Sequence, residues 1–263
     1  MSPTRRALRE MRGFVFDLDG CIWSGEVLTP GAAEVLARLR QQGKAVCFLT
    51  NNSRARARTM QAKLARLGVE AKEHEVLTPL EILGEVVARH WGSSRVLAIG
   101  GEEMAEVLVE AGHSLVPVDG FRDATVVVVG NDFDFSYERL TAAARAVAAG
   151  AAFVTPNLDP RLPQEDGEFL PGCGAIAEAV ATAAGRRPIV VGKPEPPLFE
   201  LALQRMGLGV DEAAMVGDSV DSDVRGARRV GMTAVLFAPK GGPDGVAHYM
   251  VKSMAQLRRL LGG

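Results

Sequence analysis

The chain has few cysteines and no long apolar run. Cys21, Cys47 and Cys173 are its only cysteines among 263 residues, and no Cys-x-x-Cys pair occurs. Such scattered thiols argue against a disulfide framework and favour a reducing compartment. No apolar run approaches the ~18 residues that span a bilayer. No apolar segment follows Arg5 and Arg6, as a secretory signal requires. We therefore expect a cytoplasmic protein without a membrane partner.

The chain also lacks a surplus of positive charge. Its 30 lysines and arginines face 32 aspartates and glutamates, so the formal net charge is -2. This balance argues against a broad nucleic-acid-binding surface. Hydrophobic residues at 47% and charged residues at 24% are typical of a folded globular protein, which excludes extensive disorder. The length allows one large domain or two modest ones.

Short apolar runs alternate with longer amphipathic segments along the chain. Most of the apolar runs are continuous, which predicts strands covered on both faces. These runs lie at 13–17, 44–50, 95–99, 125–130, 152–155, 188–192, 214–217 and 233–237. Helices are predicted at 31–42, 54–67, 102–111, 137–149 and 197–206, each followed by glycine. We expect Ser53 and Ser136 to be N-caps. The alternation predicts an α/β fold, a Rossmann-like doubly wound parallel sheet.

Four of the predicted strands run into polar residues of different chemical types. Asp17 and Thr50 end the runs at 13–17 and 44–50, and Lys193 and Asp218 follow the runs at 188–192 and 214–217. In an open parallel sheet, the ligand crevice lies beyond the carboxyl ends of the strands. We therefore expect carboxylates, a hydroxyl and an ammonium to line one crevice.

This set of groups suits phosphoryl chemistry. Asp17 and Asp218 together can hold Mg2+, which takes one or two carboxylates plus substrate phosphate. Lys193 would neutralise a phosphoryl group, and Thr50 and Asn51 would donate hydrogen bonds to its oxygens. A carboxylate can also attack phosphorus and form an aspartyl phosphate. Asp19 would then protonate the leaving oxygen and later activate water.

Four motifs stand in order along the chain and resemble those of the haloacid dehalogenase superfamily. They are Asp17-Leu-Asp19-Gly-Cys, Thr50-Asn-Asn-Ser53, Gly192-Lys-Pro194 and Gly217-Asp218 with Asp223. Together with Pro171-Gly-Cys-Gly174, they are most similar to the type IIA branch, the NagD-like and p-nitrophenylphosphatase-like phosphatases. The resemblance extends over essentially the whole chain.

The resemblance implies a domain organisation and a role for each motif residue. It implies a discontinuous catalytic core, 1–78 plus 188–263, and an inserted α/β cap at 79–187 that selects the substrate. The implied roles are Asp17 as nucleophile and Mg2+ ligand, Asp19 as general acid/base and ligand through its backbone carbonyl, Thr50 and Asn51 in phosphoryl binding, Lys193 in charge stabilisation, Asp218 in Mg2+ binding, and Asp223 in support of the metal site.

The identity of the substrate is not encoded in these motifs beyond a small phosphorylated metabolite. Candidate substrate-binding residues are Asn52, Asn157 and Asp159, with the acidic cluster of Glu165, Asp166 and Glu168 as a further candidate. Relatives often read Thr-Asn-x-Asp in the cap, whereas Pro156 precedes Asn157 here. Such relatives often pair through their caps, which makes a homodimer possible.

The prediction is a Mg2+-dependent phosphomonoester hydrolase, with four alternatives. A phosphomutase of the same superfamily and a catalytically silent phospho-ligand-binding protein both remain possible. A dehalogenase needs no second acid, so Asp19 argues against it. A dinucleotide-binding oxidoreductase is disfavoured because no glycine-rich turn follows the first strand. We expect no strand before the Gly-x-Gly-x-x-Ala stretch at 172–177.

Overall fold

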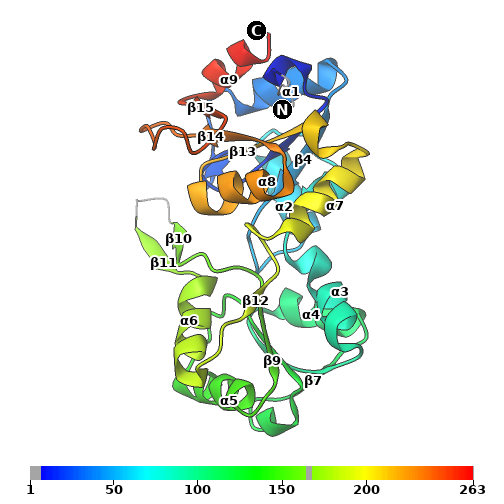
Figure 1. Ribbon diagram of the computed structural model, residues 1–263, viewed down its shortest axis with the longest axis vertical. Coiled ribbons are helices and arrows are strands. Elements are labelled where there is room, and N and C mark those ends of the chain that lie inside the picture. The colour runs from blue at the N-terminus through cyan, green and yellow to red at the C-terminus, as the bar shows by residue number, and fades with distance from the viewer. Residues whose placement is uncertain (1–6, 164–167, 263) are drawn as a thin grey trace, which may run out of the picture. The chain divides into compact units, whose positions relative to one another are not determined.

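The computed structural model describes residues 7–163 and 168–262. The chain divides into two compact units, each built on its own sheet. Unit 1 comprises Met1–Thr50, Ala57–Leu77 and Lys193–Gly263, and unit 2 comprises Asn51–Arg56 and Thr78–Gly192. Both sheets are parallel and flanked by helices, which confirms the predicted α/β fold (Figure 1). Among the described residues, no helix combines the length and apolar character needed to cross a membrane.

Unit 1 contains a six-stranded parallel sheet. Its order across the sheet is β15 (Tyr249–Val251), β14 (Thr233–Phe237), β13 (Ala213–Gly217), β1 (Gly13–Phe16), β4 (Ala45–Leu49) and β5 (Val76–Leu77). From β1 the chain winds outward through β4 to β5, and later through β13 to β15 in the opposite direction. The switch point of this doubly wound sheet therefore lies between β1 and β13, where such folds bind ligands.

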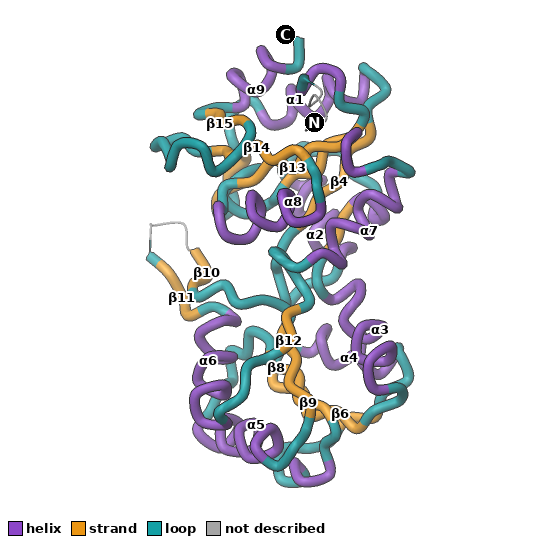
Figure 2. Tube along the Cα trace, viewed as in Figure 1, coloured by secondary structure: helices purple, strands orange, loops and turns teal. Residues whose placement is uncertain are grey.

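Helices cover both faces of the unit 1 sheet. Helix α1 packs beside α9, and α7 packs beside α8 (Figures 1 and 2). The helices of this unit are α1 (Ala32–Gln41), α2 (Ala57–Arg66), α7 (Pro196–Met206), α8 (Arg225–Val230) and α9 (Met254–Leu260). A π-helical turn, η5 (Val220–Val224), precedes α8, and short 3-10 turns lie at Leu8–Glu10, Glu73–Glu75 and Val210–Glu212. A small antiparallel ribbon, β2 (Trp23–Ser24) and β3 (Val27–Leu28), follows β1.

Unit 2 repeats the layered arrangement with a five-stranded parallel sheet. Its order is β12 (Ile189–Val190), β9 (Ala152–Thr155), β8 (Val126–Val129), β6 (Arg95–Ile99) and β7 (Ser114–Leu115). Its helices are α3 (Leu80–Trp91), α4 (Glu102–Glu110), α5 (Tyr137–Ala148) and α6 (Cys173–Ala184), with a 3-10 turn, η3 (Phe121–Asp123). Helix α3 packs on α4, and α5 packs on α6.

Burial explains why the central strands read as continuous apolar runs. All four residues of β1 and all four valines of β8 are buried, because helices cover both sides of each sheet. Local signals fix the helix ends. Ser136 is the predicted N-cap of α5, and its hydroxyl accepts a hydrogen bond from the Arg139 N–H. Gly207 ends α7 with a left-handed backbone (φ 64°), the conformation for which glycine is favoured.

Two local predictions are wrong. Helix α2 begins at Ala57, so Ser53 is not its N-cap. Further along the chain, β10 (Arg161–Pro163) pairs antiparallel with β11 (Phe169–Pro171). Strand β11 also directly precedes the Gly-x-Gly-x-x-Ala stretch, where no strand was expected. It belongs to a separate two-stranded ribbon, so the stretch still lacks the parallel-sheet context of a dinucleotide site.

Candidate active site

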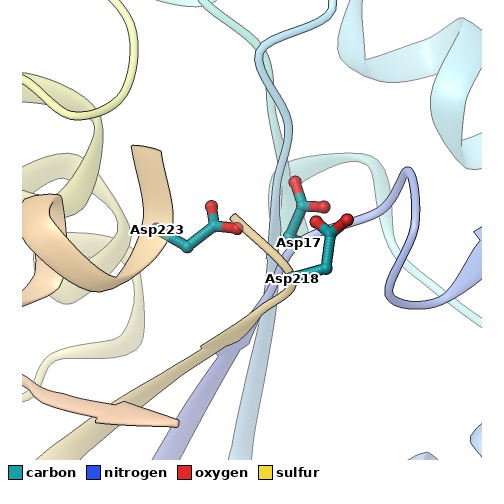
Figure 3. Close-up of side chains that lie close together, drawn as sticks. All are labelled: Asp17, Asp218 and Asp223. Atoms are coloured by element: carbon teal, nitrogen blue, oxygen red, sulfur yellow. The ribbon is translucent and has the colours of Figure 1, made fainter. Parts of the chain in front are cut away.

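Three aspartate side chains meet at the switch point of the unit 1 sheet. Asp17 directly follows β1, Asp218 directly follows β13, and Asp223 lies on η5. Their carboxylate oxygens lie within 4.8 Å of one another. Figure 3 shows Asp17 and Asp218 side by side beyond the strand ends, with Asp223 reaching them from its helical turn. Parallel strands bring these residues together because their carboxyl ends share one edge of the sheet.

Lys193 lies between two of these carboxylates. Its ammonium donates to Asp17 Oδ1 at 2.5 Å, to Asp223 Oδ1 at 2.7 Å and to the Leu49 carbonyl at 3.0 Å. All three side chains are buried, with relative exposures of 2% for Lys193, 5% for Asp17 and 1% for Asp223. Burial alone would lower the pKa of Lys193, but the two carboxylates outweigh it and raise this pKa above its usual range. Lys193 is therefore held as a cation.

The cluster carries more negative than positive charge. The pKa of Asp17 is raised well above its usual value, first by burial and then by the charges of Asp223 and Asp218, against the opposing effect of Lys193. Desolvation of its carboxylate and the nearby Asp223 likewise raise the pKa of Asp218 to about 6. An additional cation would relieve this repulsion. Clustered carboxylate oxygens are also the donors that Mg2+ prefers, so the residues present fit a magnesium site.

Two glycines have no side chain that would collide with these carboxylates. A Cβ on Gly217 would come within 2.2 Å of Asp223 Oδ2, and a Cβ on Gly20 within 2.3 Å of Asp218 Oδ2. Gly20 also has a left-handed backbone (φ 84°) that other residues adopt with strain. Asp223 Oδ2 accepts the Ser219 N–H at 3.0 Å, so both oxygens of Asp223 have donors. Asp223 thus anchors Lys193 and the turn of η5.

Asp19 lies two residues beyond Asp17, on the exposed side of the loop. Its Oδ1 accepts a hydrogen bond from the indole N–H of Trp23 at 2.8 Å, and its Oδ2 accepts a longer one, 3.4 Å, from the hydroxyl of Thr50. Thr50 itself is buried at the end of β4. The Trp23 contact was not predicted from the sequence. The only sequence signal for this contact is the position of Trp23, an aromatic residue with a polar N–H, four residues after Asp19.

The remaining predicted residues belong to unit 2, where Asn51, Asn157 and Asp159 contact one another. Asn51 donates through Nδ2 to Asp159 Oδ2 at 3.0 Å, and Asn157 donates to the Asn51 carbonyl at 2.6 Å. Asn157 also accepts the Asp159 N–H at 3.0 Å. Asn52 accepts the N–H groups of residues 54 and 55. The structure thus gives Asn157 and Asp159 a contact with a predicted phosphate-binding residue.

Several other acidic residues and Cys21 have simpler surroundings. Glu165 and Asp166 lie outside the described residues, and Glu168 is exposed. Asp221 is exposed and pairs with Arg225. Cys21 is buried, its Sγ lies 3.7 Å from the Val216 carbonyl, and burial raises its pKa, so it remains a packed thiol.

Comparisons with known proteins define the class. A family model described as haloacid dehalogenase-like hydrolase matches residues 14–114, and a second, described as HAD-hydrolase-like, matches residues 190–241. The two matches together contain Asp17, Thr50, Lys193 and Asp218, the residues that follow strands of the two sheets. The chain belongs to the haloacid dehalogenase-like hydrolases.

Several of its relatives are named as phosphatases. Chronophin of Rattus norvegicus is 36% identical, over 98% of this chain and 91% of the relative. A p-nitrophenyl phosphatase structure from Archaeoglobus fulgidus has a TM-score of 0.84 at 29% identity, covering 95% and 99% of the two chains. A glycerol phosphate phosphatase from Mycobacterium tuberculosis, solved in complex with magnesium, has a TM-score of 0.85 at 30% identity, covering 98% and 78%. The predicted family and phosphatase activity are confirmed.

Proposed function

We propose that the protein hydrolyses small phosphomonoesters through an aspartyl phosphate on Asp17. The observation that supports this most directly is the buried Asp17–Lys193–Asp223 arrangement beside Asp218. A carboxylate held at a strand end, with a fixed cation beside it, can meet a phosphoryl group whose charge that cation partly neutralises. The alternative of a silent binding protein offers no reason for a buried carboxylate as the central contact.

Asp17 and Asp218, with the backbone carbonyl of Asp19 and support from Asp223, would hold Mg2+. The bound ion would supply positive charge to the phosphoryl oxygens. This assignment is supported by the closely spaced carboxylate oxygens. The raised pKa values of Asp17 and Asp218, caused first by burial and then by the neighbouring carboxylates, agree with it.

The proposed reaction has two steps. A carboxylate oxygen of Asp17 attacks phosphorus, the bond from phosphorus to the ester oxygen breaks, and Asp19 gives its proton to that leaving oxygen. Asp19, now a carboxylate, takes a proton from water while the water oxygen attacks phosphorus. The bond to Asp17 breaks, and inorganic phosphate leaves. Lys193, Thr50 and Asn51 stabilise the phosphoryl oxygens through both steps.

Phosphate release from p-nitrophenyl phosphate, measured with and without Mg2+, tests this proposal. We expect release with Mg2+ and its loss on chelation, without loss of the fold by circular dichroism. Asp19→Asn should accumulate protein carrying one phosphoryl group on Asp17, detectable by mass spectrometry after rapid quenching. Phosphorylation at another residue, or metal-independent turnover, would contradict the proposal. An isomerised phosphate ester without released phosphate would instead identify a phosphomutase.

The rest of the proposal follows the resemblance. We propose residues 1–78 with 188–263 as the catalytic core, and residues 79–187 as a cap that selects a small phosphorylated metabolite. Glycerol phosphate is one substrate to test, since a relative is named for it. A cytoplasmic location and a homodimer formed through the cap stay predictions. Asn52, Asn157 and Asp159 stay candidates for substrate contact.

A further inference from the structure

Trp23 has a buried ring and a single polar atom directed at Asp19. Its relative exposure is 1%, and its indole N–H donates to Asp19 Oδ1 at 2.8 Å. The backbone fixes the pair, because the Gly20 N–H donates to the Trp23 carbonyl at 2.7 Å and the Trp23 N–H donates to the Leu18 carbonyl at 3.0 Å. The loop from Leu18 to Trp23 therefore forms one closed turn that holds the ring and the carboxylate together.

A cation lies against the face of the same ring. Lys63, on α2, places its ammonium 4.7 Å from the centre of the Trp23 ring. Lys63 is held there by Glu26 at 3.1 Å, and Glu26 also pairs with Arg66. A cation over an aromatic face is attracted by the ring and draws electron density from it. The indole N–H is thereby made a stronger hydrogen-bond donor toward Asp19.

We propose that Trp23 is a positioning residue for Asp19, and that Lys63 strengthens its hold. The inference rests on the proposed function, in which Asp19 gives a proton to the leaving oxygen. The indole N–H is a donor only. It therefore cannot take the proton that Asp19 delivers, and it occupies Oδ1 only. The exposed carboxylate is kept from rotating freely in water. Oδ2, which accepts the longer 3.4 Å bond from the Thr50 hydroxyl, is the oxygen that exchanges a proton with substrate.

The proposal makes a prediction about leaving groups. Proton transfer from Asp19 matters little when the leaving group is a weak base and much when it is a strong one. Phenyl phosphate and p-nitrophenyl phosphate have similar shapes, but phenolate is much the more basic leaving group. Loss of the Trp23 hydrogen bond should therefore slow phenyl phosphate hydrolysis more than p-nitrophenyl phosphate hydrolysis.

The experiment compares kcat and KM of Trp23→Phe on these two substrates with Mg2+ present. Phenylalanine keeps an aromatic ring and removes the N–H. We expect kcat to fall about tenfold on phenyl phosphate and about twofold or less on p-nitrophenyl phosphate, with KM little changed. Trp91→Phe, at the only other tryptophan, should change neither value. Equal losses on both substrates, or none, would overturn the inference.

Two further variants make the result decisive. Lys63→Gln leaves Trp23 in place and should shift the ratio of the two kcat values in the same direction, by less. If Trp23→Phe does not fold, Lys63→Gln serves as the test. An unchanged ratio of the two kcat values in Lys63→Gln then overturns the inference. Asp19→Asn should shift the ratio most. If Asp19→Asn shows no preference between the substrates, the proposed function itself fails. If Asp19→Asn shifts the ratio of the two kcat values and Trp23→Phe does not, only the proposed role of Trp23 fails.

Discussion

The two parallel sheets of this chain have similar layers but different groups beyond their strands. In unit 1, the strand ends carry Asp17 and Asp218, with Lys193 buried against Asp17 and Asp223. In unit 2, the corresponding network consists of Asn157, Asn51 and Asp159, joined mainly through amides and backbone groups. Buried ionic groups destabilise a fold unless they are paired, whereas hydrogen-bonded amides are tolerated. The comparison teaches that concentrated buried charge, rather than sheet architecture, separates the candidate catalytic unit from its neighbour.

The largest expected effect comes from removing the central carboxylate of unit 1. Asp17→Asn should lower phosphatase activity by at least about 10³-fold, because an amide oxygen is a poor nucleophile. Circular dichroism should show the fold retained. Asp123→Asn, the same change at an exposed aspartate of unit 2, should retain most activity. Near-wild-type turnover by Asp17→Asn would end the assignment of Asp17 as nucleophile.

Removing the buried cation should affect stability as well as activity. Lys193→Met leaves Asp17 and Asp223 facing each other without a cation, which we expect to cost about 3–5 kcal/mol of unfolding free energy. Thermal melting of Lys193→Met is compared with that of Lys252→Met, the same change at an exposed lysine. Adding Asp223→Asn to Lys193→Met should restore part of the loss, since one of the facing charges is gone. Equal melting temperatures for the two lysine variants would show that the buried pair has no such energetic role.

A smaller effect is expected in the amide network of unit 2. Asn157→Ala removes the 2.6 Å bond to the Asn51 carbonyl and the acceptor for Asp159 N–H. Leaving these buried groups unsatisfied should cost about 1–3 kcal/mol. It should also lower kcat/KM, because Asn51 loses its support. Ser136→Ala, which removes the N-cap of α5, should cost about 0.5–2 kcal/mol and leave kcat/KM unchanged. Equal kcat/KM values for the two variants would show that the amide network does not contribute to the reaction.

The smallest effect is expected at a more accessible ion pair of unit 1. Burial alone would raise the pKa of Glu75, but the hydrogen bonds from Arg40, at 2.7 and 2.9 Å, lower it overall. A carboxyl group whose pKa is lowered by folding stabilises the folded state when the pH is above the ordinary pKa of that group. This stabilisation is lost as the pH falls through the lower pKa of the folded state. Glu75→Gln should therefore lower stability by less than about 1 kcal/mol at neutral pH. Melting curves should converge with those of the wild type toward low pH, and a gap that widens on acidification would contradict this sign.

The core strands could be predicted because burial imposes a visible pattern. Arg95–Ile99, Ala152–Thr155 and Thr233–Phe237 have the bounds that the apolar runs predict. Strands β5 and β7 were missed, since two residues show no periodicity and their pairing depends on the neighbouring strand. The start of α2 was misplaced for a similar reason. Arg56 falls inside the helix predicted at 54–67, but it lies before α2 and pairs with Glu106 and Glu110 on α4.

Part of the candidate site could also be predicted. Asp17 and Asp218 were expected at one sheet edge, and they lie together there. Asp223 could be named only through the family resemblance, because its approach depends on the π-helical turn of η5. The contact between Asn51 and Asp159 joins residues 108 positions apart, and no local pattern encodes such a distance. The catalytic roles of all these residues stay predictions.

The boundary between the units has a practical consequence for chimaeric proteins. The boundary falls between Thr50 and Asn51, two neighbours of one motif. Thr50 belongs to unit 1 and Asn51 to unit 2. A designer who transplants only the continuous segment Thr78–Gly192 from another phosphatase would leave Asn51 facing unfamiliar side chains. The graft should also include the hexapeptide Asn51–Arg56, whose Arg56 pairs with α4 and whose Asn51 bonds to Asp159. We therefore expect a transfer of unit 2 to need both segments, Asn51–Arg56 and Thr78–Gly192.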